Sequence, residues 1–257
     1  MNLQKTAMTL ENWELQYWTW RMIPFFFIAA FGGLEMLAQF VPMICEYMQC
    51  RKLPVKGKHL DKFEMIDNVY ILLNKSMTVV LTYHVILVAW YTPSIKWKLS
   101  ELTMPNTFGS LILFFIFYDL GYASFHRLLH VRWLYPHIHK QHHRQIVPSR
   151  GNLDGINANP IEYFVASYLH LLLAWLITCH ILSVTIFIIF GAILATLNHT
   201  RYDISYGIFY SVKDHDVHHR LPESNFGQYI MLWDHLFGTY RSYSSNIALN
   251  AKGPLQD

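Results

Sequence analysis

Histidine is the residue type that stands out in this sequence. Six of the 15 histidines lie between residues 126 and 143, and three more lie between residues 215 and 219. Imidazole nitrogen binds zinc, copper, iron and nickel, so the ligand type alone does not name the metal. Histidine clusters of this density predict a metal site.

The spacing of these histidines places them on common helix faces. His126 and His130 are four residues apart, which is about one helical turn. In the two motifs His139-x2-His142-His143 and His215-x2-His218-His219, offsets of three and four residues place all three side chains within a sector of roughly 100°. His137 would point away from His139 by about 160° on the same helix and is therefore excluded as a ligand.

The number of histidines predicts two metal ions. The three motifs contain eight candidate ligands. His199 lies at the end of a long uncharged stretch, at the same predicted depth in the membrane as these motifs, and is a ninth candidate. One ion accepts about four to six ligands, so eight or nine imidazoles suit two ions with open positions. The candidate ligands are His126, His130, His139, His142, His143, His199, His215, His218 and His219.

Stretches without charged residues indicate the helices that must position these histidines. Residues 76–95, 102–118 and 163–200 contain no Asp, Glu, Lys or Arg. A membrane-crossing helix needs about 20 apolar residues, so residues 163–200 are predicted to form two helices with a tight turn near residues 178–180. The expected hydrophobic segments are 22–45, 76–93, 104–125, 162–178 and 181–199.

Two segments allow alternatives. Glu35, Pro42 and the pair Gly32-Gly33 weaken segment 22–45, which is expected either to span the membrane or to be a re-entrant or interfacial helix. Residues 60–75 are expected to form an amphipathic helix on the membrane surface, or a plain connecting helix.

Composition and charge narrow the class of protein. Of the 257 residues, 53% are hydrophobic and 14% are charged, against about 25% charged in an average soluble domain. This balance excludes a disordered chain and argues against a soluble one. The formal charge of +3 gives no sign of nucleic-acid binding, and the three cysteines form no disulfide or metal pattern.

The distribution of lysine and arginine predicts the orientation. These residues concentrate in 50–62, 126–150 and the segment after 200, which places those segments in the cytosol. The sequence therefore predicts an all-α integral membrane protein with four to five transmembrane helices and a cytosolic helical cap that holds the di-metal site. We divide it into N-terminal membrane helices with an interfacial segment (1–100) and a domain with three histidine motifs (101–257).

With these motifs, the sequence resembles the membrane-bound fatty acid hydroxylase/sterol desaturase superfamily over residues 107–241. Shorter matches are Tyr118-Asp119, Asn159-Pro160-Ile161-Glu162, His199 to Asp203, Asn225 and Trp233 to Thr239. Many members have a histidine where this chain has Asn159. The related acyl-CoA desaturases typically have a longer stretch between the second and third motifs, which favours the hydroxylase and sterol-oxidase branch.

The resemblance implies a non-haem di-iron centre that activates O2, in the endoplasmic reticulum membrane with the site facing the cytosol. It also implies electrons from NAD(P)H through an external donor such as cytochrome b5 and its reductase, since the chain has no dinucleotide-binding motif. The basic residues Arg132, Lys140, Arg144, Arg150, Lys213 and Arg220 form either a docking surface for that donor or only the positive-inside bias.

The expected reaction is hydroxylation of an unactivated C–H bond in a membrane lipid such as a sterol or a fatty acyl chain. Such a bond has no acid–base handle, so a redox metal must carry the chemistry. Asp119, Glu162 and Asp203 are expected to orient ligating imidazoles, and Asp119 is alternatively a charge at the membrane edge. The alternatives are a desaturase or aldehyde-processing member of the same superfamily, and a non-catalytic metal-binding membrane protein.

Overall fold

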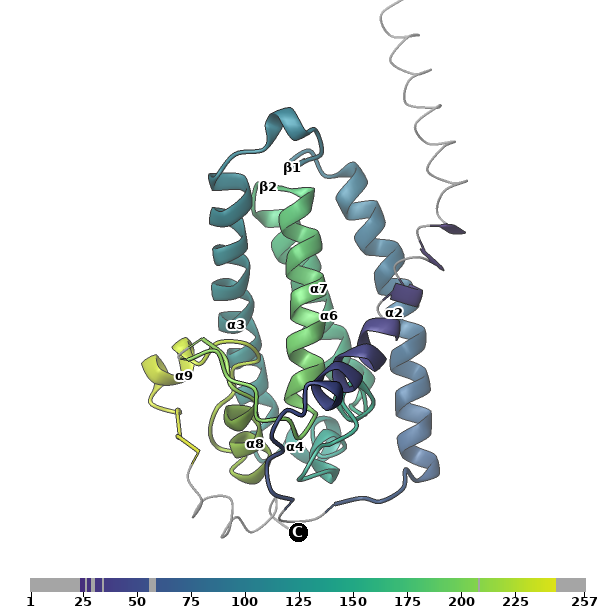
Figure 1. Ribbon diagram of the computed structural model, residues 1–257, viewed down its shortest axis with the longest axis vertical. Helices are drawn as coiled ribbons and strands as arrows, with labels where there is room; N and C mark the ends of the chain where they lie inside the picture. Colours follow the sequence, from purple (N-terminus) through teal and green to yellow (C-terminus); the bar gives the residue numbers. More distant parts are fainter. Residues whose placement is uncertain are drawn as a thin grey trace, which may run out of the picture.

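The chain is mostly helical, as predicted. The computed structural model describes residues 24–25, 27–28, 31–33, 35–55, 59–207 and 209–243. Four long helices stand side by side in it: α2 (Met65–Tyr91), α3 (Ser110–Leu129), α6 (Pro160–Leu176) and α7 (Ile181–Asn198) (Figure 1). A π-helical turn, η2 (Pro105–Gly109), extends α3 at its start.

Three of these helices are long and apolar enough to cross a membrane. They are α2, α3 together with η2, and α7, while the apolar α6 is shorter at 17 residues. The predicted hairpin over residues 163–200 is confirmed as α6 and α7, with the strand β2 (Cys179–His180) between them. The described residues thus contain three candidate spans where four to five were expected.

Residues 60–75 were expected to form an amphipathic surface helix or a plain connecting helix, but from Met65 onward they belong to α2, which continues through the predicted span 76–93. Asp67 and Asn74, which give the first part its polar character, are both buried. Asn74 donates to the carbonyls of Ile156 and Ala158, and Asp67 accepts from the Asn157 side chain. These polar residues therefore bind a loop of the protein and do not face a membrane surface.

Segment 22–45 is described only in part. Residues 35–47 are helical and run obliquely to the bundle (Figure 1). An ion pair links this helix to α2, since Lys75 Nζ on α2 lies 2.8 Å from Glu35 Oε2.

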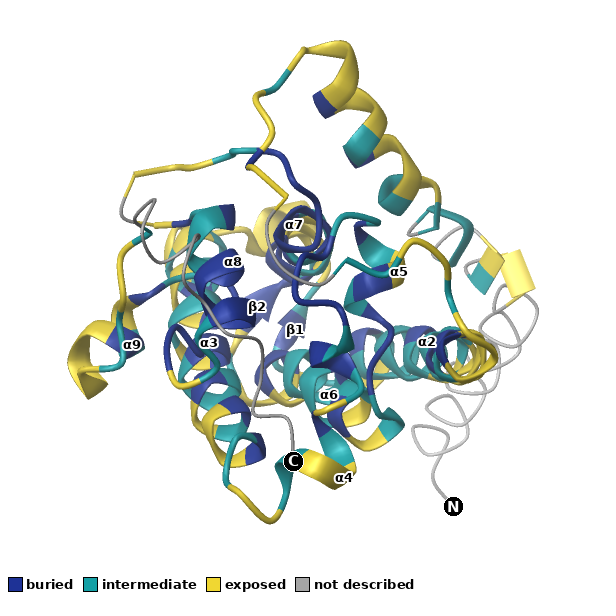
Figure 2. Ribbon diagram, turned by 90° about the horizontal axis from the view of Figure 1, so that it is seen from below, coloured by how far each residue is buried: buried dark blue, intermediate teal, exposed yellow. Residues whose placement is uncertain are grey.

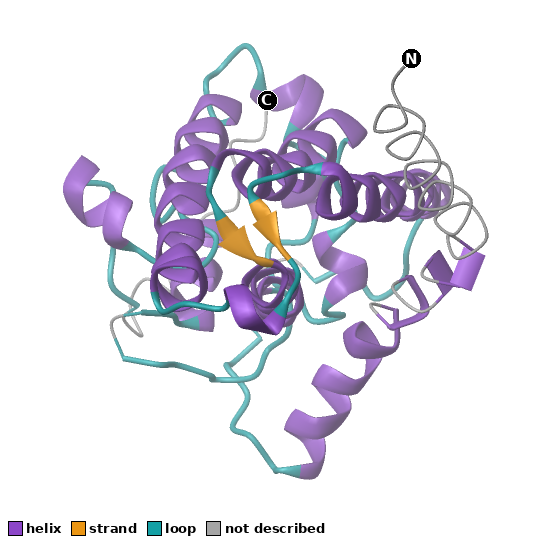
Figure 3. Ribbon diagram, turned by 90° about the horizontal axis from the view of Figure 1, so that it is seen from above, coloured by secondary structure: helices purple, strands orange, loops and turns teal. Residues whose placement is uncertain are grey.

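The two ends of the bundle differ in character. The short parallel pair of β1 (Ile95–Lys96) and β2 closes one end, with Ile95 opposite Cys179 (Figure 3). At the other end, which we call the histidine end, lie the remaining short helices of the 130–160 connection and α8 (Figure 1). The remaining short elements of the described residues are η1 (Leu99–Glu101), α4 (Tyr135–Ile138), η3 (His142–Arg144), α5 (Asn152–Gly155), α8 (Val212–Arg220) and α9 (Leu232–Phe237).

Local sequence explains how α6 begins at this end. The Asn159 side chain accepts a hydrogen bond from the Ile161 amide at 2.9 Å, and Pro160 occupies the first turn. Asparagine is a strong N-cap and proline is favoured at the first helical position. The departure from the more common histidine at position 159 therefore leaves a residue that caps the helix well.

The core between α3 and α7 is aromatic. Phe114 and Phe187 stack with their ring centroids 5.1 Å apart, and both are buried. Tyr118, one turn further along α3, packs against Phe187 and against His170 of α6. This packing holds α3 and α7 side by side, and His126 and His199 lie further along these two helices.

Candidate metal centre

Ends of helices supply most of the candidate ligands. His126 lies in the last turn of α3, and His130, His139 and His199 are the C-cap residues of α3, α4 and α7. His142 and His143 belong to η3, and His215, His218 and His219 belong to α8. All of these elements meet at the histidine end, so the structure brings together all nine histidines that were predicted from the sequence.

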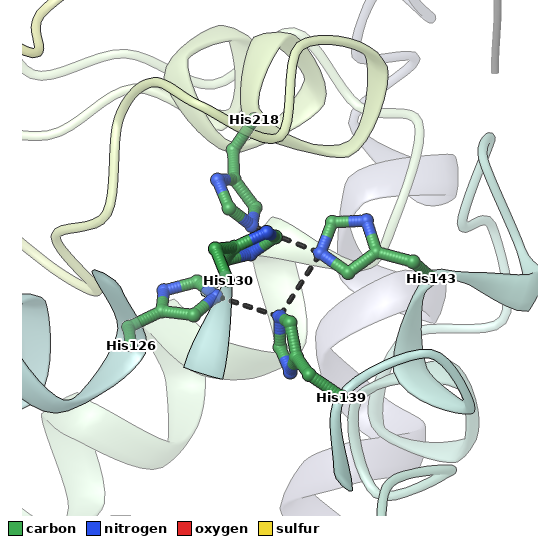
Figure 4. Close-up of side chains that lie close together, drawn as sticks. All are labelled: His126, His130, His139, His143 and His218. Atoms are coloured by element: carbon green, nitrogen blue, oxygen red, sulfur yellow. Dashed lines mark hydrogen bonds between the residues drawn. The ribbon is translucent and has the colours of Figure 1, made fainter. Parts of the chain in front are cut away.

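The nine imidazoles form two groups. The first group is His126, His130, His139, His143 and His218, and the second group is His142, His199, His215 and His219. Within each group the candidate ligand atoms lie within 4.8 Å of one another. Figure 4 shows the five rings of the first group converging from α3, α8 and the 139–143 connection.

Short nitrogen–nitrogen distances connect the members of each group. In the first group, His139 Nε2 lies 3.0 Å from the Nε2 atoms of both His126 and His143. In the second group, His199 Nε2 lies 3.3 Å from His142 Nε2 and 3.1 Å from His215 Nε2. These distances place many ring nitrogens around each of two small volumes.

The outer ring nitrogens show which nitrogen faces inward. The Nδ1 atoms of His126, His199 and His218 lie 2.9, 2.9 and 2.7 Å from the carbonyls of Phe226, Ala195 and Ser224, respectively. A carbonyl only accepts, so Nδ1 carries the proton and Nε2 presents its lone pair. Several facing lone pairs repel unless a cation lies between them, so the donor set fits a pair of metal ions.

The division into groups corrects one prediction. The three histidines of each motif were expected to share one sector, but both motifs are split between the groups. In the second motif there is no continuous helix, because α4 ends at Ile138 and η3 begins at His142. In the third motif His215 and His219 are one turn apart on α8 and point to the second group, whereas His218 points to the first. His137 is exposed and lies outside both groups, as predicted.

Burial keeps the imidazoles neutral. Eight of the nine are buried, and His130 is half-buried. Burial, together with the neighbouring His126, lowers the pKa of His130 to about 2. Burial and then neighbouring imidazoles lower the pKa values of His139, His142 and His143 on the connection and of His215, His218 and His219 on α8. Neutral imidazole is the form that binds metals.

One of the three predicted carboxylates contacts a candidate ligand. Glu162, in the first turn of α6, has Oε2 2.8 Å from Nδ1 of His139. Asp203 instead pairs with Lys213, with Oδ1 2.9 Å from Nζ, and it contacts no histidine of either group. The expectation that Asp203 orients an imidazole therefore does not match the contacts, because its side chain turns toward α8 at the protein surface.

Asp119, which was expected to orient an imidazole or to lie at the membrane edge, instead binds backbone amides. It is fully buried, and its carboxylate accepts hydrogen bonds from the backbone amides of Gln228, Tyr229 and Ile230. It therefore neither orients an imidazole nor lies as a charge at the membrane edge. It fixes the loop that leads into α9.

Two further acidic residues support the site but were not predicted from the sequence. Buried Asp234 accepts from the amides of Phe226 and Gly227, and so holds the Phe226 carbonyl that meets His126. Buried Asp216, on α8, pairs with Arg201 and Arg220. The sequence offered a signal for both residues. Asp216 lies inside the third histidine motif, and Asp234 lies in the short family match Trp233 to Thr239.

The predicted basic docking surface is smaller than expected. Arg144 pairs with Glu64 and Asp67, and Arg150 pairs with Asp154. Arg220 is buried within α8, which Figure 2 shows as largely buried. Arg132 and Lys140 are the exposed members of the predicted set.

A cavity of about 280 Å³ lies beside the second group. Its walls come from α2, α3, α6 and α7 and from residues 31–38, and they are mainly apolar. His142 and His199 form part of its lining, together with Tyr118 and Tyr122. The arrangement therefore places two candidate ligands next to a space that suits an apolar molecule.

Comparison with known proteins assigns the family. The sequence model of the fatty acid hydroxylase family matches residues 111–239, which is half of the chain and contains all nine histidines. This chain belongs to the fatty acid hydroxylase family. The resemblance noted from the motifs is thereby confirmed, and no solved structure matches the chain.

Several relatives align with this member of the fatty acid hydroxylase family over much of its length. Zebrafish (Danio rerio) cholesterol 25-hydroxylase-like protein 1, member 2 is 25% identical over 80% of this chain and 81% of its own length. The Delta(7)-sterol 5(6)-desaturase erg31 of Schizosaccharomyces pombe is 25% identical over 86% and 73%, respectively. A very-long-chain aldehyde decarbonylase (GL1-8) of rice, Oryza sativa subsp. indica, is 26% identical over 60% and 61%.

Proposed function

We propose that this chain catalyses O2-dependent hydroxylation of an unactivated C–H bond in a membrane lipid, such as a sterol or a fatty acyl chain. One observation carries the proposal. His142 and His199 belong both to the second histidine group and to the lining of the apolar cavity. A lipid in this cavity would have part of its hydrocarbon next to the candidate metal centre.

The two histidine groups, Glu162 and the cavity walls would have different roles in this reaction. The first group would hold one iron ion and the second group the other, and bound iron would supply the activation of O2 that a C–H bond requires. Glu162 would keep His139 in its orientation, and the carbonyls of Phe226, Ala195 and Ser224 would do the same for three further imidazoles. The apolar walls of the cavity would exclude water from the reacting carbon.

The electrons would come from outside the chain. We propose NAD(P)H as their source, with an external donor such as cytochrome b5 and its reductase. Exposed Arg132 and Lys140 at the histidine end are the residues available to an acidic donor. We also propose a location in the endoplasmic reticulum membrane, as the resemblance to the superfamily implies. The basic residues of this end support an orientation with the site facing the cytosol. The division into residues 1–100 and 101–257 is likewise a proposal.

The relatives motivate two alternative reactions at the same site, desaturation and aldehyde processing. Their names describe a sterol desaturase and an aldehyde decarbonylase as well as a hydroxylase. The mass of the product separates these reactions, because hydroxylation adds one oxygen and desaturation removes two hydrogens. A non-catalytic metal-binding protein would give neither product.

The experiment uses the full chain in lipid nanodiscs, loaded with iron and supplied with a reductant, O2 and extracted membrane lipids. We expect O2 consumption and a lipid product heavier by one oxygen, both abolished in His199→Ala. His137→Ala is the matched control, because His137 is exposed and lies outside both groups. Iron-loaded protein that neither consumes O2 nor changes any lipid would contradict the proposal.

A further inference from the structure

A charged pair forms part of the lining of the mainly apolar cavity. Lys75 on α2 and Glu35 on the preceding helix both belong to its lining, and their side chains retain 33% and 27% exposure. Both residues lie in apolar helical segments, where ionisable side chains are costly and usually serve a function. The pair is therefore a candidate for contact with whatever occupies the cavity.

Contacts of neighbouring residues place the pair toward the histidine end of the cavity. Asn74, which precedes Lys75, donates to the carbonyls of Ile156 and Ala158. The same connection includes Gly155, whose position packs directly against the His199 ring. Val85 lines the cavity ten residues further along α2, at a rise of about 15 Å, so the cavity extends well beyond the pair along this helix.

Several other polar groups of the lining already have partners, and the carboxylate of Glu162 contacts His139. Thr78 donates its hydroxyl proton to the Asn74 carbonyl, so the Tyr163 hydroxyl, 2.7 Å away, donates to Thr78. His170 Nδ1 faces the Ala166 carbonyl, and its Nε2 lies 3.2 Å from the Tyr229 hydroxyl. The Glu35–Lys75 pair is different, because an ammonium group has three donors and a carboxylate has several acceptor sites.

The charges of the pair determine which ligand it suits. A hydroxyl group can donate to the carboxylate and accept from the ammonium group at the same time. A ligand carboxylate near Lys75 would also meet the negative charge of Glu35, 2.8 Å from the ammonium nitrogen. An ether or ester has no proton to donate to Glu35.

We propose that the Glu35–Lys75 pair binds the hydroxyl group of an uncharged lipid alcohol in the cavity. This inference rests on the proposed function in that the cavity is taken as the substrate site. The hydroxyl donates to Glu35 and accepts from Lys75, and the apolar part of the lipid extends along the cavity toward Val85 and Ile188. The pair thereby selects neutral alcohols over free fatty acids and over lipids without a hydroxyl.

Three variants separate this role from a purely structural link between two helices. Lys75→Met and Glu35→Gln each remove one charge at nearly constant size. Thr82→Val is the matched control, because Thr82 lines the same cavity and its hydroxyl donates only to the Thr78 carbonyl of its own helix. A structural link would affect every ligand equally, whereas a recognition role changes the preference between ligands.

The test measures ligand binding to the full chain in detergent by thermal unfolding, without turnover. The probes are cholesterol and its 3-methyl ether as one arm, and octadecan-1-ol, its methyl ether and octadecanoic acid as the other. We expect the wild type to bind at least one alcohol about tenfold more tightly than its ether or acid counterpart, since a hydrogen bond to a charged group is stronger than one between neutral groups. The arm that shows the preference tells a sterol from a straight-chain alcohol.

In Lys75→Met and Glu35→Gln the preference for the alcohol is expected to fall to about threefold or less, while Thr82→Val keeps it. Equal binding of alcohol and ether by the wild type, tighter binding of the acid, or an unchanged preference in both charge variants would overturn the inference. Because these measurements need no turnover, they are independent of the oxidation assay, whose failure would refute only the proposed reaction.

Discussion

The carboxylate of Asp119, in the middle of α3, accepts a hydrogen bond from the backbone amide of Tyr229, which is 110 positions later in the sequence. Its two oxygens lie 3.0 and 3.2 Å from the Tyr229 amide nitrogen. The amides of Gln228 and Ile230 complete the contact. Tyr229 and Gln228 in turn line the cavity. One buried side chain thus connects a membrane helix to the loop that shapes the wall of the candidate substrate site.

Asp119→Ala should destabilise the protein by about 1–3 kcal/mol, because it leaves buried backbone amides without acceptors. Asp203→Ala should change the stability by less than about 1 kcal/mol, since Asp203 forms a partly exposed pair with Lys213. Thermal or denaturant unfolding of both variants in the same detergent measures the difference. Equal stability of the two variants would show that the Asp119 contacts contribute nothing.

Metal removal should make the stability of the protein sensitive to mild acid. The ordinary pKa of histidine is 6.5, and burial lowers that of His130 to about 2 in the folded state. The unfolded chain therefore binds more protons below pH 6.5, so stability is complete above that pH and falls as the pH decreases from 6.5. Each such histidine contributes a slope of about 1.4 kcal/mol per pH unit.

Chelator-treated protein is compared with iron-loaded protein by thermal unfolding between pH 5 and pH 8. We expect the chelated form to lose stability steeply below pH 6.5 and the loaded form to be more stable throughout, because ligands that bind only the folded state stabilise it. Identical curves for the two forms would mean that no metal binds at the imidazoles.

The orientation prediction is tested with single cysteines at exposed positions on the two ends of the bundle. In sealed microsomes, Lys140→Cys at the histidine end should react with an impermeant maleimide, and Lys98→Cys near β1 should not. Native Cys179 should stay silent, because burial raises its pKa to about 11 and leaves little thiolate at neutral pH. Labelling of Lys98→Cys in preference to Lys140→Cys would reverse the orientation.

The convergence of the nine histidines could be predicted from the sequence because it depends on topology. A hydrophobic hairpin returns the chain to the side from which it left, so motifs before and after the hairpin must meet. The observed hairpin of α6 and α7 confirms that reasoning. The N-cap role of Asn159, in contrast, follows from the local preference for asparagine at the start of a helix.

The division of the histidines into two groups could not be predicted, because it depends on non-helical backbone. His142 and His143 are adjacent in the chain, yet His142 Nε2 faces His199 and His143 Nε2 faces His218. The roles of Asp119 and Asp67 were equally hidden. Apart from the local contact of Asp67 with the Glu64 amide, their partners lie 74 or more positions away in loops whose conformation has no periodic signal.

The central claim is that the two histidine groups bind a pair of iron ions, and the iron content of the purified full chain tests it most directly. We predict two irons per chain for the wild type and for His137→Ala, and the loss of one iron in His142→Ala and in His218→Ala, each of which removes a ligand from one group. X-ray absorption at the iron edge should show nitrogen ligands in all of them. Folded wild-type protein that binds no iron, or histidine variants with unchanged iron content, would contradict the account.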